Sequence, residues 1–210
     1  MTQASLRAMK IRVFSDIHGD VAALARALEP DADYYFAAGD LVNWGRGLDK
    51  MGDILKAKAD RVYVLPGNHE SPEMITEFCA KFGLHDFHGR SVQIGGLHVA
   101  GLGCSSPTPF NTPGEYSEIE FERRLAPFAG RKPLVLVCHC PPKNTLLDRA
   151  GPGMNYGSTA VGEFIRREQP AYFFCGHVHE AWGARETLGV TLGVNVGKRG
   201  FELDLSELQL

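Results

Sequence analysis

The sequence predicts an α/β domain with mixed sheets, and three observations lead to this prediction. Strand and helix signals alternate over the first third of the chain. A hairpin signal and short runs broken by glycines follow, and these are typical of antiparallel strands. Each buried strand also runs into a polar cluster, as expected of an α/β sheet that binds a ligand beyond the carboxyl ends of its strands.

The first third contains three short apolar runs, each followed by a segment with helical spacing. The predicted strands are Ile11–Ser15, Tyr34–Ala38 and Val62–Leu65. The predicted helices are Val21–Leu28, Leu48–Ala59 and Pro72–Phe82. The first helix meets Glu29-Pro30, where a helix stops, and Pro72 suits a first helical turn.

The rest of the chain adds a hairpin, two helices and further strands. Ser91–Ile94 and Leu97–Gly101 flank Gly95-Gly96, which is a hairpin signal. The helices predicted next are Glu118–Phe128 and Gly157–Glu168, and the strands are Leu134–Cys138 and Ala171–Cys175. The tail, Ala181–Leu208, is predicted as strands and turns. No repeat or linker divides the sequence, so we expect residues 1–210 to form one domain.

The composition is that of an ordinary globular protein, with 44% apolar and 22% charged residues and a net charge of −3. This balance provides no basic surface for nucleic acid and no polybasic patch for a membrane. Met1–Lys10 has no apolar core of signal-peptide length, and no segment reaches the roughly 18 apolar residues that span a bilayer. We therefore expect a cytoplasmic protein. The sequence leaves its oligomeric state open.

The five cysteines are Cys79, Cys104, Cys138, Cys140 and Cys175. Their odd number and irregular spacing argue against a disulfide framework. No second cysteine pair completes a structural zinc site with Cys138-His139-Cys140. We interpret all five as small packing residues.

Metal-ligand residue types follow five predicted strands. The segments are Asp16-Ile17-His18-Gly19-Asp20, Gly39-Asp40, Gly67-Asn68-His69-Glu70, His139, and Gly176-His177-Val178-His179. Alone, Asp-x-His can be a capped strand end and Gly-Asp a turn. Five such segments in this order, each after an apolar run, indicate one site assembled by the fold.

The spacing within these segments suits metal binding. Residues two apart on an extended chain share a face, so both members of Asp16-x-His18 can reach one ion, as can both members of His177-x-His179. A glycine also precedes Asp40, Asn68 and His177, where it lets the backbone approach a metal without a Cβ clash.

This ordered set resembles the motifs of the calcineurin-like metallophosphoesterases over roughly residues 11 to 197. The stretch from His139-Cys140-Pro141-Pro142 to Gly157-Ser158 is similar to a small prokaryotic branch with single-domain members. The resemblance implies a four-layer α/β/β/α sandwich with two mixed β-sheets. It also implies two divalent metal ions and a small-molecule phosphate ester as the substrate.

The resemblance divides the candidate ligands between two ions. It implies that Asp16, His18, Asp40 and His179 bind the first ion, and that Asn68, His139 and His177 complete the second. Asp40 would bridge the two and is a predicted catalytic residue. Mixed nitrogen and oxygen donors suit Mn, Fe, Zn, Co or Ni better than Ca or Mg.

The charges of this predicted site suit an anionic ester. Two divalent ions with two carboxylates leave a formal charge of about +2, which a bridging hydroxide lowers to about +1. The expected reaction is attack of the metal-bridging hydroxide on phosphorus in a phosphomonoester or phosphodiester. No serine, cysteine or arginine signature indicates a covalent intermediate.

His69 and Asn43 are further predicted site residues. The resemblance implies that His69 contacts the phosphate, with Asn68, and protonates the leaving group. Many relatives have the motif Gly-Asp-x-x-Asp, whereas the last position of this motif is Asn43 here. In some relatives the second Asp pairs with the catalytic His. An amide can orient an imidazole but cannot offset its positive charge. We therefore expect Asn43 beside His69 in the substrate site, and we hypothesise that His69 is a weak general acid.

Two other functions stay open. The fold also occurs in protein-binding scaffolds, such as a retromer subunit, but scaffolds tend to lose ligands that are all present here. Nucleases of the family usually carry extra domains or basic grooves. We expect substrate specificity to depend on the loops Ser105–Glu115 and Lys143–Tyr156, and the sequence does not choose between monoester and diester.

Overall fold

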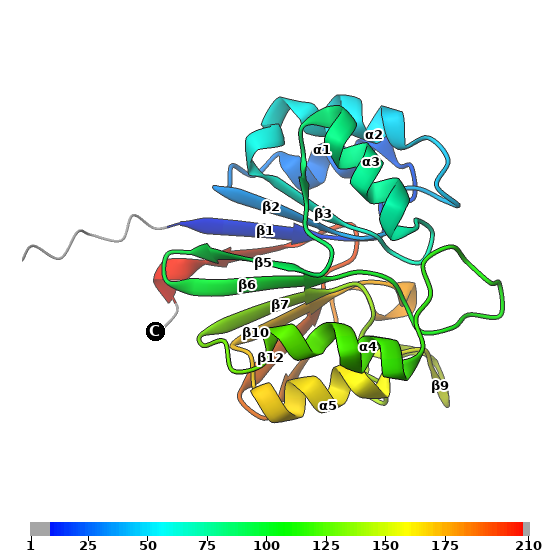
Figure 1. Cartoon of the computed structure of the whole chain (residues 1–210), viewed down its shortest axis with the longest axis vertical. Coiled ribbons are helices and arrows are strands. Elements are labelled where there is room, and N and C mark those ends of the chain that lie inside the picture. Colours follow the sequence, from blue (N-terminus) through cyan, green and yellow to red (C-terminus); the bar gives the residue numbers. More distant parts are fainter. Residues whose placement is uncertain (1–8, 208–210) are drawn as a thin grey trace, which may run out of the picture.

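Two mixed β-sheets pack face to face, and helices cover the outer face of each, in a computed structural model that describes residues 9–207 (Figure 1). Residues 1–8 and 208–210 lie outside this range, and with them parts of the N-terminal segment and of the tail considered above. The predicted four-layer α/β/β/α architecture is therefore confirmed. No described helix is both long and apolar enough to cross a membrane.

The first sheet has the strand order β13-β1-β2-β3-β4. Its strands are β13 (Phe201–Asp204), β1 (Lys10–Phe14), β2 (Tyr34–Ala38), β3 (Val62–Leu65) and β4 (His85–Asp86). Only the β13–β1 pair is antiparallel within it. The outer face is covered by α1 (Val21–Leu28), α2 (Leu48–Leu55) and α3 (Pro72–Phe82) (Figure 1).

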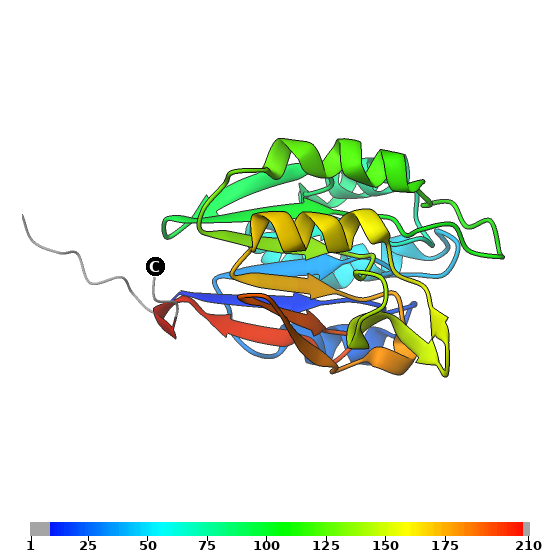
Figure 2. The same ribbon diagram turned by 90° about the horizontal axis from the view of Figure 1, so that it is seen from below.

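The second sheet has the strand order β11-β12-β10-β7-β6-β5. Its strands are β11 (Arg185–Leu188), β12 (Thr191–Asn195), β10 (Tyr172–Cys175), β7 (Leu134–Cys138), β6 (Leu97–Leu102) and β5 (Arg90–Ile94). The β11–β12 and β5–β6 pairs are antiparallel and the others are parallel. Figure 2 shows α4 (Glu118–Leu125) and α5 (Thr159–Glu168) on its outer face.

Alternation along the buried strands assigns side chains to different core layers. On β2, Tyr35 and Ala37 pack under the helices, whereas Phe36 and Ala38 pack between the sheets. β7 has no polar residue because both of its faces are covered. Full burial of one large apolar side chain contributes about 1.5–3 kcal/mol, so these layers supply most of the driving force.

Several predicted boundaries are wrong for local reasons. The predicted helix Leu48–Ala59 is α-helical only to Leu55, and a 3₁₀ segment, Lys56–Arg61, follows. Likewise, α4 gives way to a 3₁₀ turn, Ala126–Phe128, at Pro127. The helix predicted from Gly157 begins at Thr159 because the Ser158 side chain accepts the backbone N–H of Val161 as an N-cap.

Two short strand pairings were not predicted from the sequence. The strand β4 extends the first sheet, and a small hairpin, β8 (Arg149–Gly151) with β9 (Met154–Asn155), lies within the predicted loop Lys143–Tyr156. All five cysteines are free and buried, as expected of packing residues.

His88 gives the fold a pH dependence that can be measured. Its Nδ1 accepts the N–H of Gly103 at 3.0 Å, and its Nε2 lies 2.9 Å from the Tyr116 hydroxyl. Burial lowers the pKa of His88 to about 4 from an ordinary 6.5. Between these values the unfolded chain binds more protons than the folded one. The contribution of neutral His88 to the free energy of unfolding is therefore complete above pH 6.5 and is lost as the pH falls toward 4.

We expect the free energy of unfolding to fall more steeply with acid in the wild type than in His88→Gln. The amide retains a donor and an acceptor but does not titrate. The difference should reach up to about 3 kcal/mol between pH 7 and pH 4. Denaturant titrations at the two pH values measure it, and equal losses in both proteins would contradict this role for His88.

Candidate metal centre

The predicted site residues meet at one edge of the two sheets, beyond the carboxyl ends of β1, β2, β3, β7 and β10. Two contacts join the motifs from different sheets there. The backbone N–H of His177 donates to Asp16 Oδ1 at 3.0 Å, and His139 Nδ1 lies 2.8 Å from the Ala38 carbonyl oxygen. Side chains from the two ends of the chain thus share one site.

Asp16, His18 and His179 form the first group of this site. His18 Nε2 lies 2.9 Å from His179 Nε2, and His179 Nε2 lies 3.8 Å from Asp16 Oδ1. One ligand atom from each residue falls within 4.8 Å of the others. Two imidazole nitrogens and a carboxylate facing one point are suitable donors for a transition-metal ion.

Asn68, His139 and His177 form the second group. Asn68 Oδ1 lies 2.9 Å from His177 Nδ1 and 3.3 Å from His139 Nε2. The Asn68 amide nitrogen donates to Thr112 Oγ1 at 3.2 Å, which turns the amide oxygen toward the two rings. The three side chains could therefore offer two nitrogens and one oxygen to a second ion.

Asp40 lies between the two groups. Its Oδ2 is 3.7 Å from His18 Nε2 and 3.5 Å from His139 Nε2. Its Oδ1 accepts the backbone N–H of His69 at 2.9 Å, so the carboxylate has a fixed orientation. One oxygen that faces both groups has the placement of a bridging ligand.

In His139 and His18, a hydrogen bond at Nδ1 fixes which ring nitrogen faces the centre. His139 Nδ1–H donates to the Ala38 carbonyl, so Nε2 is the nitrogen that faces Asp40 and that would be free to bind a metal ion once it loses its proton. His18 Nδ1 lies 2.8 Å from Asn43 Oδ1, and because an amide oxygen only accepts, His18 Nε2 carries the lone pair. Both rings are thus oriented as metal ligands usually are.

Burial and neighbouring charges shift the pKa values of side chains in this centre. Burial alone would lower the pKa of His139, but the nearby Asp40 carboxylate dominates and raises it to about 9. His139 in turn holds the pKa of Asp40 below its usual range against the effect of burial. Burial lowers the pKa of His177 to about 3. A bound cation would replace the His139 proton as the partner of Asp40.

The backbone at the candidate ligands is not extended, which corrects our spacing argument. Asp16, His18 and His177 have φ values of 57°, 51° and 69°, in the left-handed region that L residues seldom adopt. Moreover, His177 faces Asn68 whereas His179 faces His18, so the two histidines belong to different groups. The structure therefore does not bring the two histidines to one point, as their spacing suggested, and the division between two ions that the family resemblance implies stays a prediction.

The glycines before Asn68 and His177 leave room for side chains of other motifs. A Cβ at Gly67 would lie 2.0 Å from Asp40 Oδ1, and a Cβ at Gly176 would lie 2.4 Å from Asp16 Oδ2. Each glycine leaves the space into which a carboxylate of another motif packs.

Gly67→Ala should therefore displace Asp40 and lower the rate of ester hydrolysis by at least about a hundredfold, since shifts near 1 Å can cost that much. Steady-state rates of metal-reconstituted protein measure this effect. Gly162→Ala is the matched control, because a Cβ there meets nothing closer than 3.7 Å. Equal rates in the two variants would contradict the packing role of Gly67.

Glu70 is a positioning residue to which the sequence analysis gave no role. It is fully buried, and its carboxylate accepts the backbone N–H groups of Asp40, Val42 and Gly67 at 3.1, 2.9 and 3.0 Å. It thus joins the second and third motifs. Its position at the end of the Gly-Asn-His-Glu motif is the sequence feature that could have indicated this positioning role.

Asn43 lies beside a different histidine from the one we expected. Its amide oxygen contacts His18, and its amide nitrogen donates to the His18 carbonyl at 3.3 Å. His69 Nδ1 instead accepts the backbone N–H of Trp44 at 3.3 Å. The expected Asn43–His69 pair is therefore wrong. A neutral His69 carries its proton on Nε2 because Nδ1 accepts.

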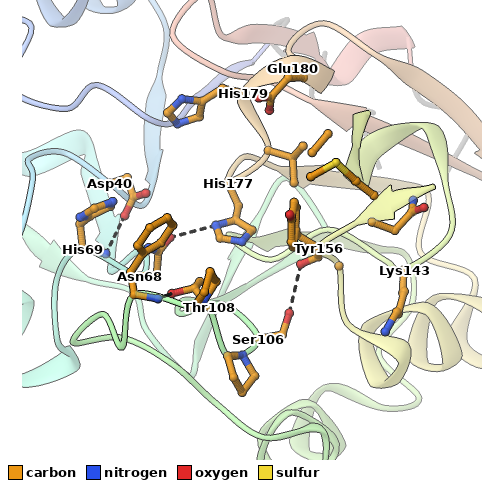
Figure 3. A pocket seen from close by; sticks show the side chains of 18 of the residues that line it. Asp40, Asn68, His69, Ser106, Thr108, Lys143, Tyr156, His177, His179 and Glu180 are labelled. Carbon is orange, nitrogen blue, oxygen red and sulfur yellow. Dashed lines mark hydrogen bonds between the residues drawn. The ribbon is translucent and has the colours of Figure 1, made fainter. Parts of the chain in front are cut away.

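A cavity of about 540 Å³ adjoins the centre (Figure 3). Asp40, Asn68 and His69 contribute to one side of it. Both predicted specificity loops contribute too, through residues 106–110 of the first and through Lys143 and residues 154–156 of the second. Asn43 is not among its lining residues.

Comparisons with known proteins identify the family of this chain. The model of the calcineurin-like phosphoesterase family matches residues 9–181. An uncharacterised protein of Methanocaldococcus jannaschii, MJ1162, is 31% identical over 200 residues, which are 92% of this chain and 90% of that protein.

Two solved structures share the fold at low sequence identity. TT1561 of Thermus thermophilus has a TM-score of 0.70 at 19% identity, over 95% of this chain and 100% of its own. The phosphopantetheinyl hydrolase PptH of Mycobacterium tuberculosis has a TM-score of 0.65 at 16% identity, over 90% of this chain and 89% of its own. At such identities these structures support the fold alone.

Proposed function

The chain belongs to the calcineurin-like phosphoesterase family, whose members are generally metal-dependent phosphoester hydrolases, and from this premise we propose that it hydrolyses phosphomonoesters or phosphodiesters with two divalent metal ions. The observation that carries the proposal is the position of Asp40. Its Oδ2 faces His18 of one ligand group and His139 of the other.

The donor set fits two transition-metal ions. In the proposal, Asp16, His18, Asp40 and His179 hold one ion, and Asp40, Asn68, His139 and His177 hold the other. Nitrogen donors favour Mn, Fe, Zn, Co or Ni over Ca and Mg. When bound, such ions supply Lewis acidity toward a phosphate and activate water for in-line displacement.

In this proposal, side chains at the cavity orient the substrate. Asp40 and Asn68 line both the centre and the cavity, so a phosphate held there has its organic group directed into the cavity. His69 lines the same cavity, and its Nε2–H can donate to a phosphate oxygen or to the leaving group. Within residues 9–207, His69 Nδ1 accepts the backbone N–H of Trp44 and makes no ion pair with a carboxylate, so we keep the hypothesis that His69 is a weak general acid.

A substrate panel tests the proposed activity. Protein reconstituted with Mn or Zn is offered nitrophenyl phosphate, bis-nitrophenyl phosphate and cyclic nucleotides, with Asp40→Ala alongside. We expect hydrolysis of at least one ester by the wild type alone. If the wild type retains two ions yet is no faster than Asp40→Ala on every ester, the enzyme proposal fails and the protein-binding scaffold is favoured. If it binds no metal, the site assignment fails first.

A further inference from the structure

Hydrogen bonds organise both loops that form the walls of the cavity beside the candidate metal centre. In the first loop, Glu115 Oε1 accepts the Thr112 N–H at 2.8 Å, the Thr112 hydroxyl at 2.5 Å and the Thr108 hydroxyl at 2.6 Å. Thr112 Oγ1 in turn accepts the amide N–H of Asn68. This loop is therefore tied to a candidate metal ligand.

The second loop is organised in the same way around a buried carboxylate, Asp148. Asp148 accepts the backbone N–H groups of Thr145 and Gly157 at 2.9 and 3.0 Å and the amide N–H of Asn155 at 2.6 Å. The Ser106 hydroxyl joins the two loops by donating to the Tyr156 carbonyl at 3.1 Å. Such preorganisation lowers the cost of binding a ligand of defined shape.

Large apolar side chains on these loops are exposed at the cavity. Phe110, Met154 and Tyr156 are 71%, 49% and 43% exposed, and all three line it beside Pro107 and Pro109. Apolar groups gathered on a concave surface are typical of ligand sites. The volume of about 540 Å³ is that of a site for an organic molecule rather than for a phosphate alone.

The charges at the cavity are unevenly placed. Among residues 9–207, Lys143 makes no ion pair within 4.0 Å, although its charge also acts on the Glu118 carboxylate, and Figure 3 shows Lys143 on the opposite side of the pocket from Asp40 and His69. The Glu118 carboxylate is occupied by the Ser158 hydroxyl and by backbone N–H groups at the start of α5. Glu180 lies near His179 and repels anions from that side (Figure 3).

We propose that the substrate is a phosphate ester with a bulky aromatic group next to the phosphate and a second anionic group farther away. The aromatic group packs on Phe110, Met154 and Tyr156, and the second anion meets Lys143. This inference rests on the proposed phosphoesterase activity and specifies the class of ester that the site selects.

The aromatic preference is tested with phenyl phosphate and 2-naphthyl phosphate, whose leaving groups have similar acidity. We expect kcat/KM of the reconstituted wild type to be about tenfold higher for the naphthyl ester, from the extra apolar area buried. Phe110→Ala should reduce this ratio severalfold. Ile119→Ala, at a 79% exposed position outside the cavity, should preserve it.

The second anion is tested with a naphthyl phosphate that carries a carboxylate on the distal ring. The wild type should prefer it to plain naphthyl phosphate by about fivefold, the value of a modest ion pair. Lys143→Met should abolish this preference, whereas Lys50→Met, at an exposed position on α2, should retain it.

The outcomes separate this inference from the proposed function. Turnover of nitrophenyl phosphate with equal kcat/KM for the phenyl and naphthyl esters overturns the aromatic site but leaves the phosphoesterase activity intact. An equal carboxylate preference in the wild type and Lys143→Met overturns the role of Lys143. Failure to hydrolyse any ester overturns both proposals.

Discussion

Asp40→Asn should lower kcat by at least about a thousandfold on every ester, which corresponds to several kcal/mol of transition-state stabilisation. The variant keeps an oxygen that can accept the His69 N–H but loses the charge that faces both His18 and His139. We also expect the metal content to fall below two ions per chain. Steady-state kinetics and metal analysis of the same preparation measure the two effects.

Asp20→Asn is a closely matched control for Asp40→Asn. Asp20 lies near the first motif but serves as the N-cap of α1, where its side chain accepts the Ala23 N–H at 2.9 Å. Asparagine caps helices as well as aspartate does. The control should keep wild-type rates and metal content. A similar loss in both variants would show that the effect of Asp40→Asn is not specific to the centre.

His69→Gln should slow alkyl phosphates by about 10²–10⁴-fold but nitrophenyl phosphate by less than about tenfold. An alkoxide needs a proton as it leaves, and a nitrophenolate does not. If His69 is a weak general acid, as we hypothesise, the wild type should also prefer nitrophenyl to alkyl esters strongly; within residues 9–207 its Nδ1 accepts a backbone N–H and makes no ion pair with a carboxylate.

The leaving-group series is measured under conditions where chemistry limits the rate, with His98→Gln, on β6, as the control. An equal loss on both ester classes in His69→Gln would assign His69 to phosphate binding alone. Equal wild-type rates on the two classes would contradict the hypothesis of a weak general acid.

The sequence was sufficient for the architecture because each layer has a local signature. The apolar runs at β2, β3 and β7 and the helical periods at α1 and α3 agree with the structure to the residue. The two-residue strand β4 and the β8–β9 hairpin were not predictable in this way. They are too short to show a period, and tertiary contacts decide them.

The candidate site was predictable as a set of residues but not as a network. The order of motifs predicted which residues lie together, whereas spacing placed His177 and His179 side by side although they contact different residues, because local rules assume regular φ and ψ angles. The partner of Asn43 and the positioning role of Glu70 depend on how loops from separate strands meet. No single-sequence pattern encodes such contacts.

Anomalous X-ray diffraction from crystals of Mn-reconstituted protein locates the ions directly. We expect two peaks per chain about 3.5–4 Å apart, one bounded by Asp16, His18 and His179 and the other by Asn68, His139 and His177, with Asp40 between them. A single peak, or peaks away from these side chains in fully loaded protein, would contradict a dinuclear centre.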